Sequence, residues 1–250
     1  MKHCVIILNR RDSFVNQQDY TTRKLAKGPT VEERATRHSL LLRFYHRYLS
    51  DSDTARFIAS VSGRYSQATL ERLAQSGDTY ARRASALALG LVGDGRSNVV
   101  LGPLLRSVDR KLRLVVDDAL RSIWLREGSI QDRQLLERIV RLNECGEFES
   151  VVELATEKLA ASDGSPELYH QRSLALFQLD SIEQAIEDCR KTLKLNLYHY
   201  AAMIGLGHCH TERGDLLEAL FWFRQALDVY PDLEPVRVQI RRLEKTIQDL

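Results

Sequence analysis

The sequence predicts an all-α protein in which helical hairpins stack into a right-handed α-α superhelix. Three observations predict this fold class. Amphipathic helical patterns follow one another along the 250 residues, and only five prolines interrupt them. Side chains of the same kind recur every 34 residues in the C-terminal part and every 31 residues in the middle. With 44% apolar and 28% charged residues, the chain can bury a core and is not disordered as a whole.

Residues 1–29 form an N-terminal arm of unknown structure, because Val5–Leu8 is their only apolar run. That run is too short for the hydrophobic part of a signal peptide, and the charged residues 10–12 follow at once. No stretch approaches the ~20 apolar residues that cross a bilayer. Four cysteines without regular spacing do not form a disulfide framework. We therefore expect a cytoplasmic protein that does not bind membranes.

Segment 30–127 is expected to consist of helices packed in pairs. Apolar residues recur at helical spacing in a first helix over 31–49, which we expect to cap the stack. Helices over 53–61 and 66–76 follow. Ser66, Leu70 and Leu73 recur 31 residues later, so the two helices are expected to pack against each other as a partial copy of a repeated pair.

Two copies of the 31-residue pattern come next. Asp78 and Asp109 are each expected to act as the N-cap of a helix, and an arginine lies four residues after each of them. An Ala-Leu pair recurs at the same spacing. This pattern resembles HEAT repeats, in which that arginine commonly binds acidic side chains inside the stack. The resemblance implies structural roles for Arg82 and Arg113.

Segment 128–233 is expected to contain helical hairpins with a period of 34 residues. The turn inside each hairpin is predicted at Gly146, Asp180 and Gly214. A glycine or aspartate at this position suits a tight turn between two helices. The copies of the pattern span 132–165, which is degenerate, 166–199 and 200–233.

The last copy resembles the tetratricopeptide repeat at its small and aromatic signature positions, which are Leu206, Gly207, Ala219, Phe223, Ala226 and Pro231. Gly207 is expected to let two helices approach closely, Phe223 to fill the space between neighbouring repeats, and Pro231 to end the second helix. The resemblance implies an α-solenoid with a concave groove, acting as a non-catalytic scaffold or adaptor that binds another protein. Residues 234–250 are expected to form an amphipathic capping helix.

The resemblance also implies which residues line the groove. The family's lysine-and-asparagine clamp for an acidic C-terminus is missing, because its positions carry His170 and Leu174. We therefore expect the groove to bind a peptide or amphipathic helix through apolar side chains. In the alternative, Leu174 and Phe177 are buried under a neighbouring helix. The positions that the family uses are Glu167, His170, Leu174, Phe177, Gln178, Ala201, Ile204, His208, Thr211 and Glu212.

Charge is distributed unevenly along the chain. The net charge of +2 results from +6 over residues 1–50, +3 over 51–130 and −7 over 131–250. The basic half offers an alternative function, the binding of nucleic acid or of an acidic partner. The opposite charges of the two halves also predict salt-sensitive self-association. The basic residues expected to face solvent are Arg83, Arg106, Arg110 and Lys111.

Three strings of residues resemble chemical motifs but favour structural interpretations. Residues 90–97 differ from a phosphate-binding loop because Arg96 replaces the lysine, and the 31-residue register places their glycines in a turn between helices. Neighbours on a helix point about 100° apart, so residues 208–210 do not chelate one metal ion. For the same reason Asp117 and Asp118 do not act together as an acid/base pair. They are expected on a solvated face, and in the alternative Asp118 pairs with a neighbouring arginine. We predict no enzyme activity, metal or cofactor.

Overall fold

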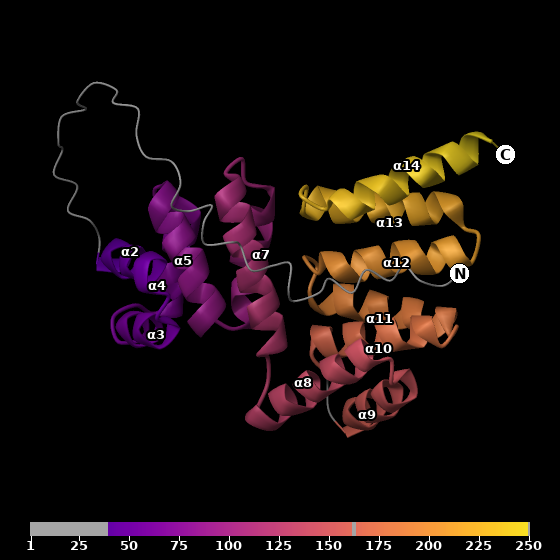
Figure 1. Cartoon of the computed structure of the whole chain (residues 1–250), viewed down its shortest axis with the longest axis horizontal. Coiled ribbons are helices and arrows are strands. Elements are labelled where there is room, and N and C mark those ends of the chain that lie inside the picture. Colours follow the sequence, from indigo (N-terminus) through magenta and orange to yellow (C-terminus); the bar gives the residue numbers. More distant parts are fainter. Residues whose placement is uncertain (1–39, 162–163, 250) are drawn as a thin grey trace. The chain divides into compact units, whose positions relative to one another are not determined.

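The computed structural model describes residues 40–161 and 164–249. The arm over 1–29 and the first part of the helix expected over 31–49 therefore lie outside the described residues. Every regular element in the described part is helical, and within each unit adjacent helices pack against each other, as in an α-α superhelical repeat fold (Figure 1). The chain divides into two compact units between Ser66 and Gln67. We describe each unit by itself.

The first unit contains α2 (Leu40–Asp51) and α3 (Thr54–Ser62), which pack against each other. Asp53 begins α3 as its N-cap, because its carboxylate accepts a hydrogen bond from the backbone N–H of Arg56 at 2.9 Å. This confirms the helix predicted over 53–61. The side chains buried by the two helices are Leu41, Leu42, Tyr45, Phe57 and Val61.

The second unit begins with a segment of helices packed around α5 and α7. Asp78 accepts hydrogen bonds from the backbone N–H groups of Tyr80 and Ala81, and Asp109 accepts one from Lys111, so both are N-caps as predicted. The predicted turn at Gly93-Asp94-Gly95 follows α5 directly. The elements are α4 (Gln67–Ser76), α5 (Thr79–Val92), η1 (Gly95–Ser97), α6 (Asn98–Leu101), η2 (Gly102–Arg106) and α7 (Arg110–Leu125).

The helices expected over 53–61 and 66–76 correspond to α3 and α4. Within the second unit, α4 packs against α5. Because α3 and α4 belong to different units, their pairing stays a prediction.

The rest of the second unit is a series of antiparallel hairpins that ends in a single helix. All three predicted turn residues adopt the left-handed conformation, with φ of 82° at Gly146, 61° at Asp180 and 79° at Gly214. This confirms the 34-residue period. The helices are α8 (Ile130–Cys145), α9 (Phe148–Ala161), α10 (Pro166–Gln178), α11 (Ile182–Leu195), α12 (Tyr200–Glu212), α13 (Leu216–Val229) and α14 (Glu234–Gln248).

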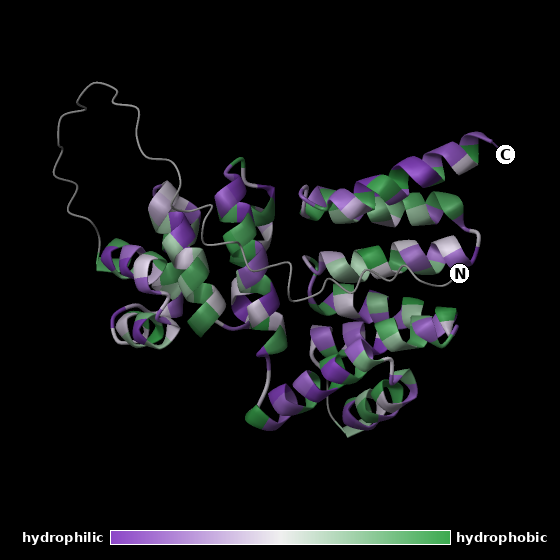
Figure 2. Cartoon of the chain, viewed as in Figure 1, coloured by the Kyte–Doolittle hydropathy of each residue, from purple (hydrophilic) through white to green (hydrophobic). Residues whose placement is uncertain are grey.

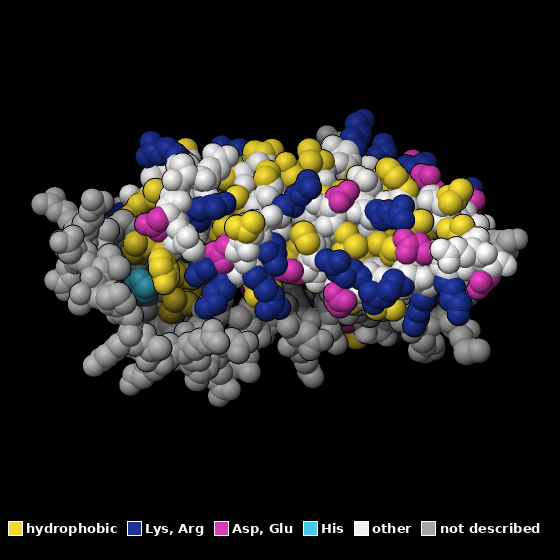
Figure 3. All heavy atoms as spheres, turned by 90° about the horizontal axis from the view of Figure 1, so that it is seen from above, with side chains coloured by type: hydrophobic (Ala, Val, Ile, Leu, Met, Phe, Trp, Pro, Cys, Tyr) yellow, Lys and Arg dark blue, Asp and Glu magenta, His cyan; other side chains and the backbone are white. Residues whose placement is uncertain are grey.

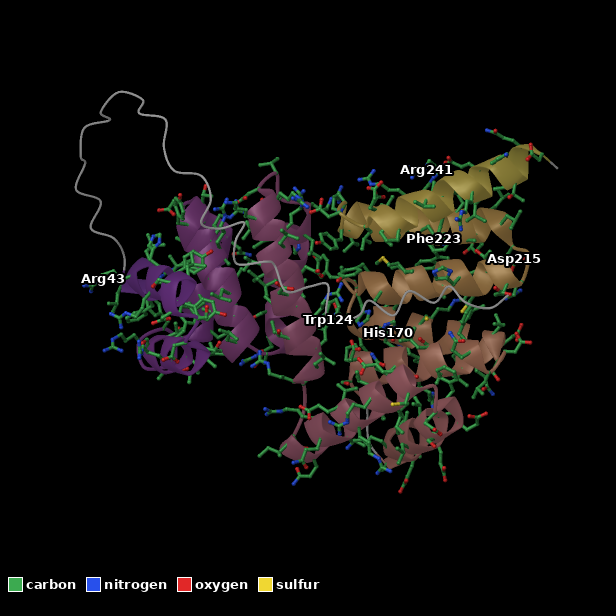
Figure 4. All side chains as sticks on the ribbon, viewed as in Figure 1. Arg43, Trp124, His170, Asp215, Phe223 and Arg241 are labelled. Atoms are coloured by element: carbon green, nitrogen blue, oxygen red, sulfur yellow. The ribbon has the colours of Figure 1, made fainter. Side chains whose placement is uncertain are left out.

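Packing within the last hairpin follows from its signature residues. A Cβ atom on Gly207 would lie 2.6 Å from the Phe223 ring, so only glycine leaves room for this ring between α12 and α13 (Figure 4). Phe223 thus fills a space within its own repeat, whereas we expected it between repeats. α13 is hydrophobic along most of its length, and α14 alternates hydrophobic and hydrophilic residues (Figure 2). The buried face of α14 contains Val236, Ile240 and Leu243.

No helix among residues 40–161 and 164–249 combines the length and apolar character that a membrane span requires.

Candidate functional site

The candidate groove lies along α10 and α12, which contact each other. Leu174 and Phe177 on α10 and Ile204 and His208 on α12 are all half-buried. The rings of Phe177 and His208 are 6.4 Å apart, so the structure brings the two helices' groove positions together. Leu174 and Phe177 keep part of their surface exposed, and Phe177 also packs against the buried cluster that contains Leu206. We call Leu174, Phe177, Ile204 and His208 the groove stripe.

His208 belongs to the groove stripe as a neutral ring. It packs edge-on against Phe223 with ring centroids 5.1 Å apart. This burial lowers the pKa of His208 below its ordinary value, because the charged form is poorly solvated there. The imidazole therefore adds an uncharged, largely apolar surface at neutral pH.

The other expected groove residues fall into two groups. Gln178 and Ala201 are half-buried beside the groove stripe, and Thr211 and Glu212 are exposed at the end of α12. The Thr211 hydroxyl already donates a hydrogen bond to the Gly207 carbonyl oxygen at 2.8 Å. Glu212 thus places a negative charge at that end of the groove.

The expectation that Glu167 and His170 line an open groove is wrong. His170 is 7% exposed and Glu167 is 6% exposed. Glu167 accepts hydrogen bonds from Nε2 of Gln171 at 2.7 Å and from Nε2 of His199 at 3.1 Å. These residues cannot contact a partner, since they form part of the protein interior.

The protonation of this buried group follows from its contacts. Nδ1 of His199 accepts a hydrogen bond from the backbone N–H of Ala202 at 3.2 Å, so the proton of a neutral imidazole is on Nε2, facing Glu167. Burial alone would raise the pKa of Glu167, but the hydrogen bond from His199 holds it at about 2. Burial is the main cause that lowers the pKa of His170 to about 3; His199 and Arg121 act in the same direction, and Glu167 acts against them. Glu167 is thus charged and His170 neutral near pH 7.

Helix α7 covers this end of α10 and α12. The Trp124 ring stacks on His199 at 4.2 Å between centroids, and its Nε1 donates to Oδ1 of Asn98 at 3.0 Å. Trp124 and His170 lie at the same junction of helices (Figure 4). Asp117 accepts hydrogen bonds from the Tyr200 hydroxyl and from Nε of Arg121. We call the following residues the junction cluster: Asp117, Arg121, Trp124, Glu167, His170, His199 and Tyr200.

The solvated face expected for Asp117 and Asp118 is therefore wrong. Asp117 is buried, and burial together with the charge of Asp117 raises the pKa of Asp118 to about 7. The sequence contains a signal of this burial. Asp117 shares one face of its helix with Leu120 and Trp124, three and seven residues later, and a carboxylate on an apolar face implies a buried polar partner.

The expected basic surface is only partly present. Arg106, Arg110 and Lys111 are exposed. Arg83 is not, because its side chain is 15% exposed and binds Asp109 through two hydrogen bonds of 2.6 and 2.7 Å. Arg83 thus makes the internal contact that we expected of Arg82, whose Nε instead donates to the Ala74 carbonyl oxygen.

The cysteines and remaining histidines near the groove are structural. Cys209 and His210 are buried in the core, where the repeat register places them. Among the described residues, no group of three or more His, Cys, Asp or Glu side chains is arranged to hold a metal ion.

Comparison with known proteins supports the repeat assignment. Two consecutive segments, 166–199 and 200–233, match the family model described as tetratricopeptide repeat. They correspond to the hairpins α10–α11 and α12–α13, which contribute the groove stripe. No match to the chain was found among curated proteins.

Proposed function

We propose that this chain is a non-catalytic adaptor whose groove stripe binds an apolar segment of another protein. The observation that supports it is that side chains on two consecutive repeats keep part of their surface exposed, with the rings of Phe177 and His208 6.4 Å apart. These side chains are Leu174, Phe177, Ile204 and His208. Tetratricopeptide repeats generally mediate protein–protein interaction, which supports this proposal. The chemistry of the surface favours a peptide or amphipathic helix that inserts apolar side chains.

The charge around the groove stripe limits which kind of partner segment fits the groove. Glu212 is exposed at the end of α12, and the buried His170 does not offer a cation to a carboxylate. A segment with apolar anchors and a basic or neutral end therefore fits better than one with an acidic C-terminus.

Selection of binders from a library of displayed peptides tests the proposal. Wild-type protein should select peptides with recurrent apolar residues, and Leu174→Asp/His208→Asp should lose at least tenfold in affinity for them. The matched control is Gln184→Asp/Leu197→Asp, which adds the same charge at exposed positions outside the groove. Thermal melting checks that each variant folds. If Leu174→Asp/His208→Asp is unfolded, Ile204→Glu replaces it as the groove variant. Equal binding by groove and control variants would contradict the proposal.

A second candidate function uses the exposed Arg106, Arg110 and Lys111 to bind a nucleic-acid backbone or an acidic protein. The face that contains the start of α7 and α14 carries many lysine and arginine side chains (Figure 3). Binding to arbitrary DNA or RNA at ~50 mM salt should weaken steeply with added salt. If no complex forms at that salt concentration, this candidate fails.

A further inference from the structure

Helix α8 belongs to the same series of first helices as α10 and α12. It precedes a turn at Gly146, which adopts the same left-handed conformation as Asp180 and Gly214 one and two repeats later. α8 also packs against α10 (Figure 1). Nδ2 of Asn143 donates hydrogen bonds to the carbonyl oxygen and to Oε1 of Gln171 on α10, at 3.0 and 2.9 Å. α8 is therefore in the 34-residue register, although the family model matches only the two hairpins that follow.

The register identifies the side chains of α8 that correspond to the groove stripe. Val140 has the repeat position of Leu174 and His208, and all three are half-buried. Glu144 has the repeat position of Glu212, and both are exposed. The groove positions thus continue from α12 and α10 onto α8.

Two carboxylates lie at one edge of these three helices. Glu144 and Glu212 are each in the last turn of their helix, and we call them the acidic edge. Gln178, at the same place in α10, carries no charge. Neither carboxylate of the acidic edge forms a hydrogen bond or an ion pair with another residue of the described part. Both charges are therefore available to a partner.

Basic side chains do not balance the acidic edge from the groove positions of α8, α10 and α12. Arg133 is the only lysine or arginine at these positions, and it lies at the start of α8, about 16 Å along the helix from Glu144. Arg141 is closer, but it has the repeat position of Ala175 and Cys209, which are buried rather than open to the groove.

We propose that the groove extends over α8 and binds a segment of another protein that carries two lysine or arginine side chains, one for Glu144 and one for Glu212. Apolar side chains between these two cations contact the groove stripe. This inference rests on the proposed function and specifies the chemistry of the partner segment. An exposed ion pair contributes little free energy, so the apolar contact supplies most of the affinity and the charges select the partner.

The geometry of the helices limits the spacing of the two cations. Packed helices lie about 8–10 Å apart, so two steps from α8 to α12 cover about 18 Å. That length corresponds to about six residues of an extended segment, and side chains six residues apart point to the same side. In a helical segment it corresponds to about eleven or twelve residues, which also share one side.

Selection from a library of displayed random peptides, with the full chain as bait, tests the proposal. Wild type should select peptides with two basic residues at either spacing and apolar residues between them. For synthetic copies of these peptides, Glu144→Lys/Glu212→Lys should raise the dissociation constant at least tenfold at ~50 mM salt, and the difference should shrink at ~1 M salt. Peptides without this pair of basic residues would overturn the proposal.

A matched variant controls for the change of net charge. Glu149→Lys/Glu183→Lys makes the same charge change at exposed positions of the second helices α9 and α11. It should bind the selected peptides within twofold of wild type. Because all four glutamates are exposed, both variants should keep the melting temperature of wild type. Equal weakening in the two variants would contradict a local role of the acidic edge.

The result also separates this inference from the proposed function. Suppose that the selected peptides are apolar, lack paired basic residues and lose affinity for Leu174→Asp/His208→Asp. The groove function then stands and the charge preference is wrong. The single variants show how far the groove extends, because each removes one contact. If Glu212→Lys weakens binding and Glu144→Lys does not, the groove ends at α10 and the proposal is overturned.

Discussion

His170 has a role that its repeat position does not reveal. The register assigns it to a groove, but the ring is buried beside Glu167 and His199. Its Nδ1 has no hydrogen-bond partner among the described residues, and a charged imidazole there would be poorly solvated. The interior therefore tolerates His170 only as the neutral form.

Protonation of His170 should make folding depend on pH. Because its pKa is lowered from 6.5 to about 3, the unfolded chain binds a proton between these values that the folded chain does not bind. The free energy of unfolding thus falls as the pH falls through this range, by about 2 kcal/mol for this residue from pH 6.5 to pH 5. Urea unfolding at both pH values should show this loss in wild type and a smaller loss in His170→Gln. An equal loss in wild type and His170→Gln would contradict the assignment of this pH dependence to His170.

The hairpin elements are the part of the fold that the sequence predicts best. Gly146, Asp180 and Gly214 follow a helix and precede another at constant spacing, and each adopts a positive φ. The turn depends on residues next to one another in the chain, so its signal is local. The packing of α4 against α5 depends instead on which surfaces fit, and an amphipathic pattern alone does not identify the partner of a helix.

Gly214 offers a test of the hairpin turn. Its φ is 79°, and an added Cβ would have no neighbour within 4 Å, so Gly214→Ala changes backbone strain without a steric clash. We expect Gly214→Ala to lower the free energy of unfolding by about 1 kcal/mol. Gly214→Asn should cost less, since asparagine tolerates the left-handed conformation, as Asp180 does in the preceding repeat. Equal urea midpoints for wild type and Gly214→Ala would refute this explanation.

Within the second unit, the junction cluster and one ion pair connect α7 to the tetratricopeptide hairpins. Arg113 donates to both carboxylate oxygens of Asp232 at 2.8 and 2.9 Å, and Asp117 accepts from Tyr200. These residues are 119 and 83 positions apart in sequence. No repeat period relates them, so they could not be paired from the sequence, although Asp117 on an apolar face signalled a buried partner.

Because of this connection, we expect the helices around α5 and α7 and the hairpins that follow them to gain and lose stability together. Tyr200→Phe removes the hydroxyl that donates to Asp117 and should lower the free energy of unfolding by about 1–3 kcal/mol. Hydrogen exchange should become faster in α5 and α7 as well as in α12 and α13. Faster exchange confined to α12 and α13 would mean that the segments unfold independently.

For the whole molecule, the main proposal is that a peptide binds in the groove along α10 and α12, and hydrogen exchange tests it directly. Hydrogen exchange of the wild-type chain is compared with and without a peptide chosen by display. If the peptide binds in the groove, exchange should become slower in α10 and α12, around Leu174 and Ile204, and should not change in α9 or at the start of α7. Protection centred on Arg106, Arg110 and Lys111, with none in α10 and α12, would contradict it and favour the basic surface.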